Sequence, residues 1–208
     1  MQGSYILLAA LGIFILIGGA KRIVKSLKLS SISAVILIIL IIVGNMFGVI
    51  GGAVYIGSIL LIALCFIYIF TNHTKVILGT FASIIIVAGI LLLYQFQIID
   101  RFSIGELPSE IMLIAGCAIS SFIFAKSAGQ AFVIAILSMN LYYISALFMN
   151  GGIIVIGDNV AFDLMMYSSL GAIFLSEIVS EFVSLFSDRA PDLQFEAGKI
   201  EDEDKEIK

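Results

Sequence analysis

Between Leu29 and Thr74 the chain contains no Asp, Glu, Lys or Arg, and this stretch is long enough for two helices of the ~20 residues that cross a bilayer. Soluble domains carry a charged residue at roughly one position in four. Across all 208 residues, 61% are hydrophobic and 12% are charged. The sequence therefore predicts an all-α membrane protein whose main partner is the lipid bilayer, with one transmembrane domain over residues 1–186.

Seven apolar runs fill that domain, and each predicts one transmembrane helix. The runs are Tyr5–Ala20, Ile32–Phe47, Val54–Phe70, Val76–Gln95, Leu107–Ala125, Ala131–Phe148 and Val160–Phe186.

The positive charges predict how these spans are oriented. An outside N-terminus and a cytoplasmic C-terminus leave only Arg101 on the outer side, as the positive-inside rule favours. We therefore expect a multi-pass protein of the plasma (inner) membrane. A six-span alternative, in which the second and third runs form a hairpin that does not fully cross, fits less well because it moves the later basic loops outward.

Two glycine-rich turns share the pattern GGxxxIG, at residues 51–57 and 151–157. Both are predicted on the outer side, which suggests two parallel three-helix repeats, residues 1–75 and 107–186, joined by a linker helix at residues 76–97. Interrupted segments at corresponding places mark the binding site in transporters built from repeats, and SWEET sugar carriers are an analogy for this layout. Coincidence is the alternative, since the chain has 19 glycines. The predicted helix breaks are Gly51, Gly52, Gly57, Gly151, Gly152 and Gly157.

The segment from Gly151 to Phe186 is apolar, yet it carries four carboxylates and no Lys or Arg. A charge at the middle of a membrane helix costs about 2.5–3.5 kcal/mol on insertion scales, so it is usually kept for a function. On one continuous helix Asp163, Glu177 and Glu181 share a stripe. We expect Asp163, Glu177 and Asp158 to bind a substrate or ion, with Asn45 and Asn140 as further polar lining. Interfacial anchoring or structural hydrogen bonding is the alternative.

No catalytic constellation is apparent. His73 is the single histidine and lies beside Lys75, which favours a solvated loop residue over a general base. Gly157-Asp158 matches part of the GxGD motif of intramembrane aspartyl proteases, but the sixth span has no second Asp to complete the pair. The sequence predicts no enzyme activity, cofactor or metal site, and it has no basic field that would bind nucleic acid.

Three motifs resemble an uncharacterised bacterial family of polytopic membrane proteins (domain of unknown function 1614). They are the VIGGA turn (Val49–Ala53), the GDNVAFD turn (Gly157–Asp163) and LSEIVSE (Leu175–Glu181). The chain departs from the family at Asp158-Asn159, where members carry small residues, and Asp163 matches the family's aspartate. The resemblance implies a membrane location and a fold, with no established activity.

These features favour a transporter or channel-like conduit for a small solute or cation. The alternative is a non-transporting scaffold that recruits a protein partner through its tail. Residues 187–208 contain eight acidic and four basic residues, which account for the whole net charge of -4. Such a charged tail with few aromatic residues is expected to be disordered.

Overall fold

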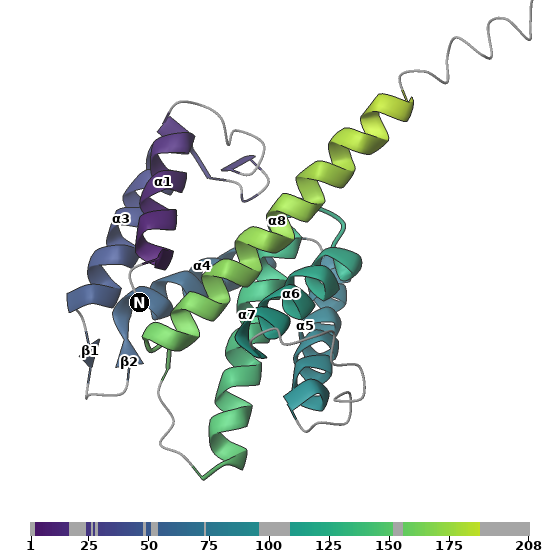
Figure 1. Ribbon diagram of the computed structural model, residues 1–208. Coiled ribbons are helices and arrows are strands. Elements are labelled where there is room, and N and C mark those ends of the chain that lie inside the picture. The colour runs from purple at the N-terminus through teal and green to yellow at the C-terminus, as the bar shows by residue number, and fades with distance from the viewer. Residues whose placement is uncertain are drawn as a thin grey trace, which may run out of the picture.

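The computed structural model describes residues 3–16, 24–25, 27, 29–47, 49–50, 54–72, 74–95, 109–151 and 156–187. Within these residues the chain forms seven α-helices and one short hairpin (Figure 1). In chain order the elements are α1 (Gly3–Leu16), α3 (Ser31–Phe47), β1 (Val49–Ile50), β2 (Val54–Tyr55), α4 (Ile56–Phe70), α5 (Thr74–Gln95), α6 (Ser109–Phe124), α7 (Ala128–Met149) and α8 (Asn159–Ser187).

The helices lie where the apolar runs predict them. Each of the seven expected spans overlaps one helix, with boundaries that differ by a few residues. Three helices, α5, α7 and α8, are long and apolar enough to cross a membrane. The apolar helices α3, α4 and α6 are shorter, at 17, 15 and 16 residues. The predicted all-α fold is therefore confirmed for the main elements of the described chain.

The hairpin is a departure from the predicted pattern. Val49 pairs with Tyr55 and Ile50 with Val54 in an antiparallel ladder. The third span was expected to begin at Val54, but Val54 and Tyr55 are extended and α4 begins at Ile56. Valine and tyrosine suit an extended backbone, and here each has a partner strand at hand. The turn between α3 and α4 is therefore a small ladder, with residues 51–53 outside the described part of the chain.

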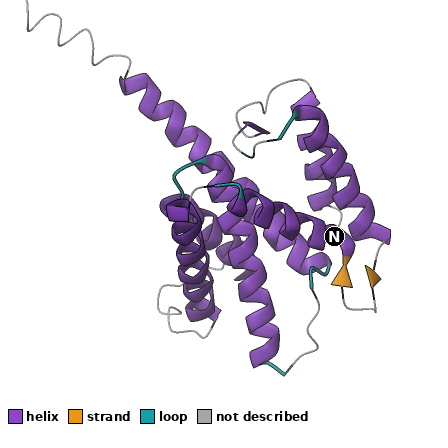
Figure 2. Ribbon diagram, turned by 180° about the vertical axis from the view of Figure 1, so that it is seen from behind, coloured by secondary structure: helices purple, strands orange, loops and turns teal. Residues whose placement is uncertain are grey.

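Helix α7 lies at the centre of the bundle and packs against α4, α5, α6 and α8. Every residue from Ala128 to Asn140 is buried. Helix α8 crosses this core, and both ribbon views show its C-terminal turns projecting beyond the other helices (Figure 1, Figure 2). Its 29 residues make it about 43 Å long.

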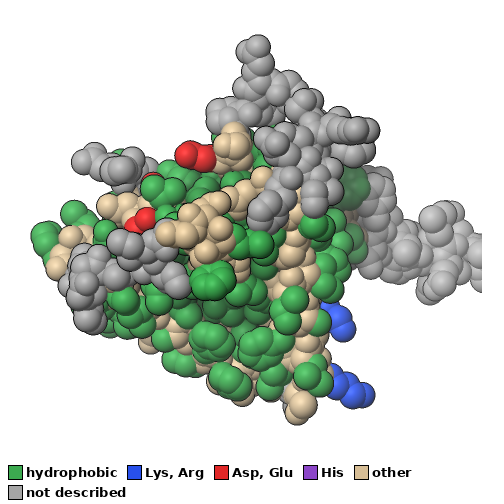
Figure 3. Space-filling model, turned by 90° about the horizontal axis from the view of Figure 1, so that it is seen from below, with side chains coloured by type: hydrophobic (Ala, Val, Ile, Leu, Met, Phe, Trp, Pro, Cys, Tyr) green, Lys and Arg blue, Asp and Glu red, His purple; other side chains and the backbone are tan. Residues whose placement is uncertain are grey.

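The outer surface of the bundle is apolar. Large hydrophobic side chains point away from the core on α3 (Ile36, Ile39), α5 (Ile85) and α6 (Ile119, Ile123), and Ile85 and Ile123 are each 65% exposed. Hydrophobic side chains make up most of the described face seen in Figure 3, where acidic and basic side chains appear at a few places near its edges. Such a surface is unfavourable in water and is matched by hydrocarbon.

The hydrogen bonds show that successive helices run in alternating directions. Asn45 near the end of α3 meets Ser58 near the start of α4, and Tyr143 of α7 meets Asp158 just before α8. We call this the turn end of the bundle. At the opposite end, Tyr68 of α4 lies 3.4 Å from Ser127, and Thr80 of α5 accepts a hydrogen bond from Gln130 of α7. We call this the lysine end, after Lys126.

Candidate functional site

The two glycine-rich turns meet at the turn end. Val54 forms a parallel β-bridge with Ile156, and the Tyr55 amide donates to the Ile156 carbonyl oxygen at 3.1 Å. The described parts of the two GGxxxIG copies, residues 54–57 and 156–157, therefore meet although they are about 100 residues apart in sequence. The Tyr55 amide and the Ile156 carbonyl, which both lie outside the helices, thereby satisfy each other, as is required wherever water is excluded.

Ser58, in the first turn of α4, joins this helix to the connection before α8. Its hydroxyl oxygen lies 2.9 Å from the Gly157 carbonyl oxygen and 3.0 Å from Oδ1 of Asn45. Gly157 has a φ of +72° and lies so close to Ser58 that a Cβ atom would overlap the serine side chain. Glycine is the residue that accepts both constraints.

Asn45 extends this contact to the first helix. It is 2% exposed, and its Nδ2 donates to the Tyr5 hydroxyl at 3.0 Å. The Tyr5 hydroxyl donates in turn to Oδ1 of Asn159 at 3.0 Å, and the Tyr5 ring stacks on Phe162. The polar network of Tyr5, Asn45, Ser58, Gly157 and Asn159 therefore joins α1, α3, α4 and α8 at one end of the bundle.

Asp158 lies beside this network and caps α8. Its Oδ1 accepts from the Ala161 amide at 2.8 Å, and its Oδ2 accepts from the Tyr143 hydroxyl at 2.7 Å. A carboxylate at this place satisfies one of the open amides of the first turn and is stabilised by the helix dipole. The structure thus gives Asp158 two structural partners.

Asp163 lines a cavity of about 250 Å³ between α6 and α8, also at the turn end. Glu110 from the first turn of α6 and Tyr167 of α8 line the same cavity, with Ile114, Val160 and Leu164 as its apolar walls. The volume holds several water molecules or a small solute. Two carboxylates and a phenol are mainly hydrogen-bond acceptors, so this cavity suits a cation or a solute rich in donors.

Glu177 lines a different cavity. That cavity lies at the lysine end, where Lys126 and Ser127 also border it. Fourteen residues separate Asp163 from Glu177, which is about 21 Å along a helix. Both carboxylates lie on the side of α8 that faces α6, whereas Glu181, the third member of the predicted stripe, is exposed and lines neither cavity. One small solute does not reach both Asp163 and Glu177.

Asn140 lies apart from both cavities. It is buried in α7, and its Nδ2 lies 3.5 Å from the Met165 sulfur of α8. This contact joins the two central helices. The described structure gives it a packing role and does not bring it to the other predicted site residues.

The predicted helix breaks differ in what they do. Gly151 follows the end of α7 with a φ of +66°, and Gly157, with a φ of +72°, lies two residues before α8 begins at Asn159. Gly57 is helical, in the first turn of α4, where it allows close contact with the backbone of α3 at Ile41 and Asn45. Gly51, Gly52 and Gly152 lie outside the described residues, as does nearly all of the acidic tail.

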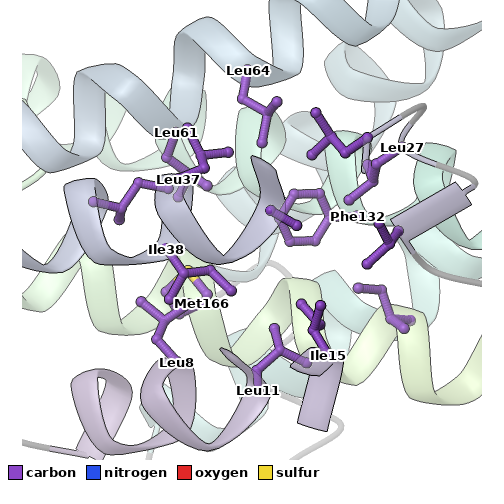
Figure 4. Close-up of a pocket in the computed structure, with 15 residues that line it drawn as sticks. Leu8, Leu11, Ile15, Leu27, Leu37, Ile38, Leu61, Leu64, Phe132 and Met166 are labelled. Atoms are coloured by element: carbon purple, nitrogen blue, oxygen red, sulfur yellow. The ribbon is translucent and has the colours of Figure 1, made fainter. Parts of the chain in front are cut away.

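A further cavity, of about 60 Å³, lies among α1, α3, α4, α7 and α8 (Figure 4). Leu8, Ile38, Leu61, Phe132 and Met166 are among the side chains that line it. Its walls offer almost no polar atoms, so a polar solute would lose its hydrogen bonds on entering. This cavity is unsuited to the solutes that the cavity at Asp163 fits.

The sequence did not indicate Tyr5, Ser58 or Glu110 as site residues. One signal for Ser58 was present, because each GGxxxIG copy is followed directly by a hydrogen-bonding side chain, Ser58 or Asp158. In each case that side chain meets a polar residue near the end of the preceding helix, Asn45 or Tyr143. No local signal marks Tyr5, whose partners are 40 and 154 residues away.

Comparison of the chain with protein-family models, with curated proteins and with solved structures gave no match. The family resemblance of the turn motifs therefore stays a prediction, and the functional argument depends on the geometry of the chain itself.

Proposed function

We propose that this chain is a seven-span protein of the plasma (inner) membrane that moves a small cation or donor-rich solute, with its N-terminus outside. Three observations support the membrane location. Three helices are long and apolar enough to cross, the surface of the bundle is apolar, and successive helices alternate in direction. The shorter helices span when they tilt little or when the bilayer thins around them.

The observation that carries the transport proposal is the cavity lined by Asp163 and Glu110. Asp163 is half-buried near the start of the largely apolar helix α8, where an ionisable group is usually kept for a function. The cavity lies at the end where the two turns meet, and interrupted segments of this kind border the substrate site in repeat-built transporters. Asp163 is proposed to bind the solute, with Glu110 and Tyr167 completing the acceptors.

Glu177 is proposed as a second group on the same route, near the lysine end. A solute or proton that leaves Asp163 would meet Glu177 about 21 Å further along α8. Carboxylates at successive depths within membrane helices are a recurrent feature of proton and cation pathways.

The test uses the full chain in sealed liposomes with a gradient of protons or of potassium ions, followed by a dye inside the liposomes. We expect flux above that of protein-free liposomes, and we expect Asp163→Asn to abolish it. Glu181→Gln is the matched control, because Glu181 lies on the same helix, is exposed, and lines neither cavity.

Two outcomes would reject the proposal. One is wild-type flux no greater than that of empty liposomes for every ion and solute tried. The other is an Asp163→Asn protein that inserts and carries solute like the wild type. Glu177→Gln in the same assay tests the second group. Reduced flux would place Glu177 on the route, and wild-type flux would place it outside the route.

A further inference from the structure

The cavity at the lysine end has a volume of about 470 Å³ and lies between the α6–α7 connection and α8. Lys126 borders it from the connection, and Ser176, Glu177 and Ser180 border it from α8. The volume falls within the range of about 300–1,000 Å³ that small-molecule sites occupy. One groove thus offers a cation, a carboxylate and hydroxyl groups to a ligand.

The connection that carries Lys126 is held by reciprocal hydrogen bonds. The Ser127 hydroxyl accepts from the Gln130 amide at 3.2 Å, and the Gln130 side chain accepts from the Lys126 amide at 2.9 Å. This arrangement resembles a capping box at the start of α7, except that the returning side chain bonds the amide of Lys126, one residue before the N-cap Ser127. Gln130 also donates to Thr80 of α5 at 3.0 Å, which fixes the box against the bundle. The position of Lys126 at the edge of the groove is therefore built into the fold.

The groove lies at the depth of lipid headgroups if α8 crosses the bilayer. If the start of α8 at Asn159 lies at one edge of the hydrocarbon, Glu177 lies 18 residues or about 27 Å further along the helix. That length is close to the ~30 Å thickness of the hydrocarbon, so Glu177 comes near its other edge. The side chains of Val179 and Val183 also line the groove and are exposed, at 41% and 59%. A ligand here meets charged groups on one side and apolar ones on the other, which describes an amphiphile.

We propose that this groove binds the headgroup of a phospholipid that carries a primary ammonium beside its phosphate, as phosphatidylethanolamine does. The phosphate lies against Lys126, the ammonium against Glu177, and the acyl chains run along Val179 and Val183. A phospholipid without an ammonium would leave its negative phosphate beside the negative Glu177 with no cation between them. A trimethylated ammonium has no N–H to donate to Glu177. The inference needs the membrane location proposed above and does not depend on transport.

The experiment measures which lipids stay with the purified full chain after reconstitution in equal mixtures of phosphatidylethanolamine, phosphatidylcholine and phosphatidylglycerol. Native mass spectrometry identifies the retained lipid. We expect a preference of at least about tenfold for the ethanolamine lipid, which is the lower end of what one charge-assisted hydrogen bond supplies. Glu177→Gln should remove this preference, and Lys126→Gln should weaken retention of all three lipids.

Two matched controls share the chemistry and lie elsewhere. Glu181→Gln is one turn further along α8, and Lys75→Gln is an exposed lysine of α5; neither residue lines the groove. Both should retain the wild-type preference. Thermal unfolding in detergent confirms that each variant is folded before its lipids are compared.

The outcomes that overturn the proposal are distinct. Equal retention of the three lipids, or a preference for phosphatidylglycerol, removes the role of Glu177. Displacement of the retained lipid by millimolar phosphoethanolamine, at the same molar ratio in wild type and both controls, would assign the groove to a soluble compound instead. Loss of preference in Glu181→Gln would show that charge on α8 in general, and not this groove, selects the lipid.

Discussion

The hydroxyl oxygen of Ser58 lies 2.9 Å from the carbonyl oxygen of Gly157, and this contact joins the first turn of α4 to the connection before α8, 99 residues away. Gly157 is constrained twice, by its φ of +72° and by the serine side chain that occupies the space of a Cβ atom. Gly151 shares the first constraint alone, since its φ is +66° and nothing lies within 4 Å of where its Cβ would be. The two glycines therefore separate backbone strain from crowding.

We expect Gly151→Ala to lower the free energy of unfolding by about 1–2 kcal/mol, the cost of a left-handed backbone for an L-residue. Gly157→Ala should cost that amount and about 1–3 kcal/mol more, because Ser58 must move away from its hydrogen-bond acceptors. Thermal or denaturant unfolding of the purified chain in detergent provides the comparison. Equal losses in the two variants would mean that Ser58 does not pack on Gly157 as described.

A second pair of glycines tests the contact between α3 and α4. A Cβ at Gly57 would lie 2.6 Å from the backbone nitrogen of Asn45 and would overlap the backbone carbonyl oxygen of Ile41. At Gly79, by contrast, nothing lies within 4 Å of where a Cβ would be. Gly79→Ala should raise the stability by up to about 1 kcal/mol through helix propensity. Gly57→Ala should lower it by about 1–3 kcal/mol, because backbone atoms cannot move aside cheaply. A stabilising Gly57→Ala would contradict the described spacing of these helices.

The network around Tyr5 predicts non-additive losses of stability. Tyr5→Phe removes the hydroxyl that accepts from Asn45 and donates to Asn159, at a cost of about 1–3 kcal/mol. The loss of stability in the double variant Tyr5→Phe/Asn45→Ala should be smaller than the sum of the two single losses by about 0.5–3 kcal/mol, as for residues in one network. Thr80→Val at the lysine end is the control, and with Tyr5→Phe it should add within about 0.5 kcal/mol. Full additivity of Tyr5→Phe and Asn45→Ala would rule out a shared network.

The helices could be predicted because an apolar helix is specified by a local run of apolar residues between polar or glycine-rich turns. The way in which the helices pack together could not be predicted from these runs. The GGxxxIG pattern suggested that residues 51–57 and 151–157 are related, but no feature of either sequence predicts that Val54 pairs with Ile156. Long-range pairing depends on how whole helices pack, and a single sequence records it only indirectly.

The same limit applies to the candidate site. Helical periodicity placed Asp163 and Glu177 on one side of α8, but the groups that face them come from other elements. Glu110 lines the same cavity as Asp163, and Lys126 lines the same cavity as Glu177. Both pairs depend on how far α6 is shifted along α8 where the two helices pack. Close contact of small residues sets this register, since a Cβ at Gly171 would lie 3.1 Å from the Ala118 Cβ. Small residues predict close approach without naming the partner.

The proposed topology predicts which ends of α7 face each side of the membrane. Ser127 and Asn150 flank this 22-residue helix, and both are exposed. In cells that express the full chain, a membrane-impermeant maleimide should label Asn150→Cys from outside and Ser127→Cys only after permeabilisation. The native Cys65 and Cys117 are each 0% exposed and should give little background. Labelling of both engineered cysteines from the same side would mean that α7 does not cross, and the alternation of seven spans would fail with it.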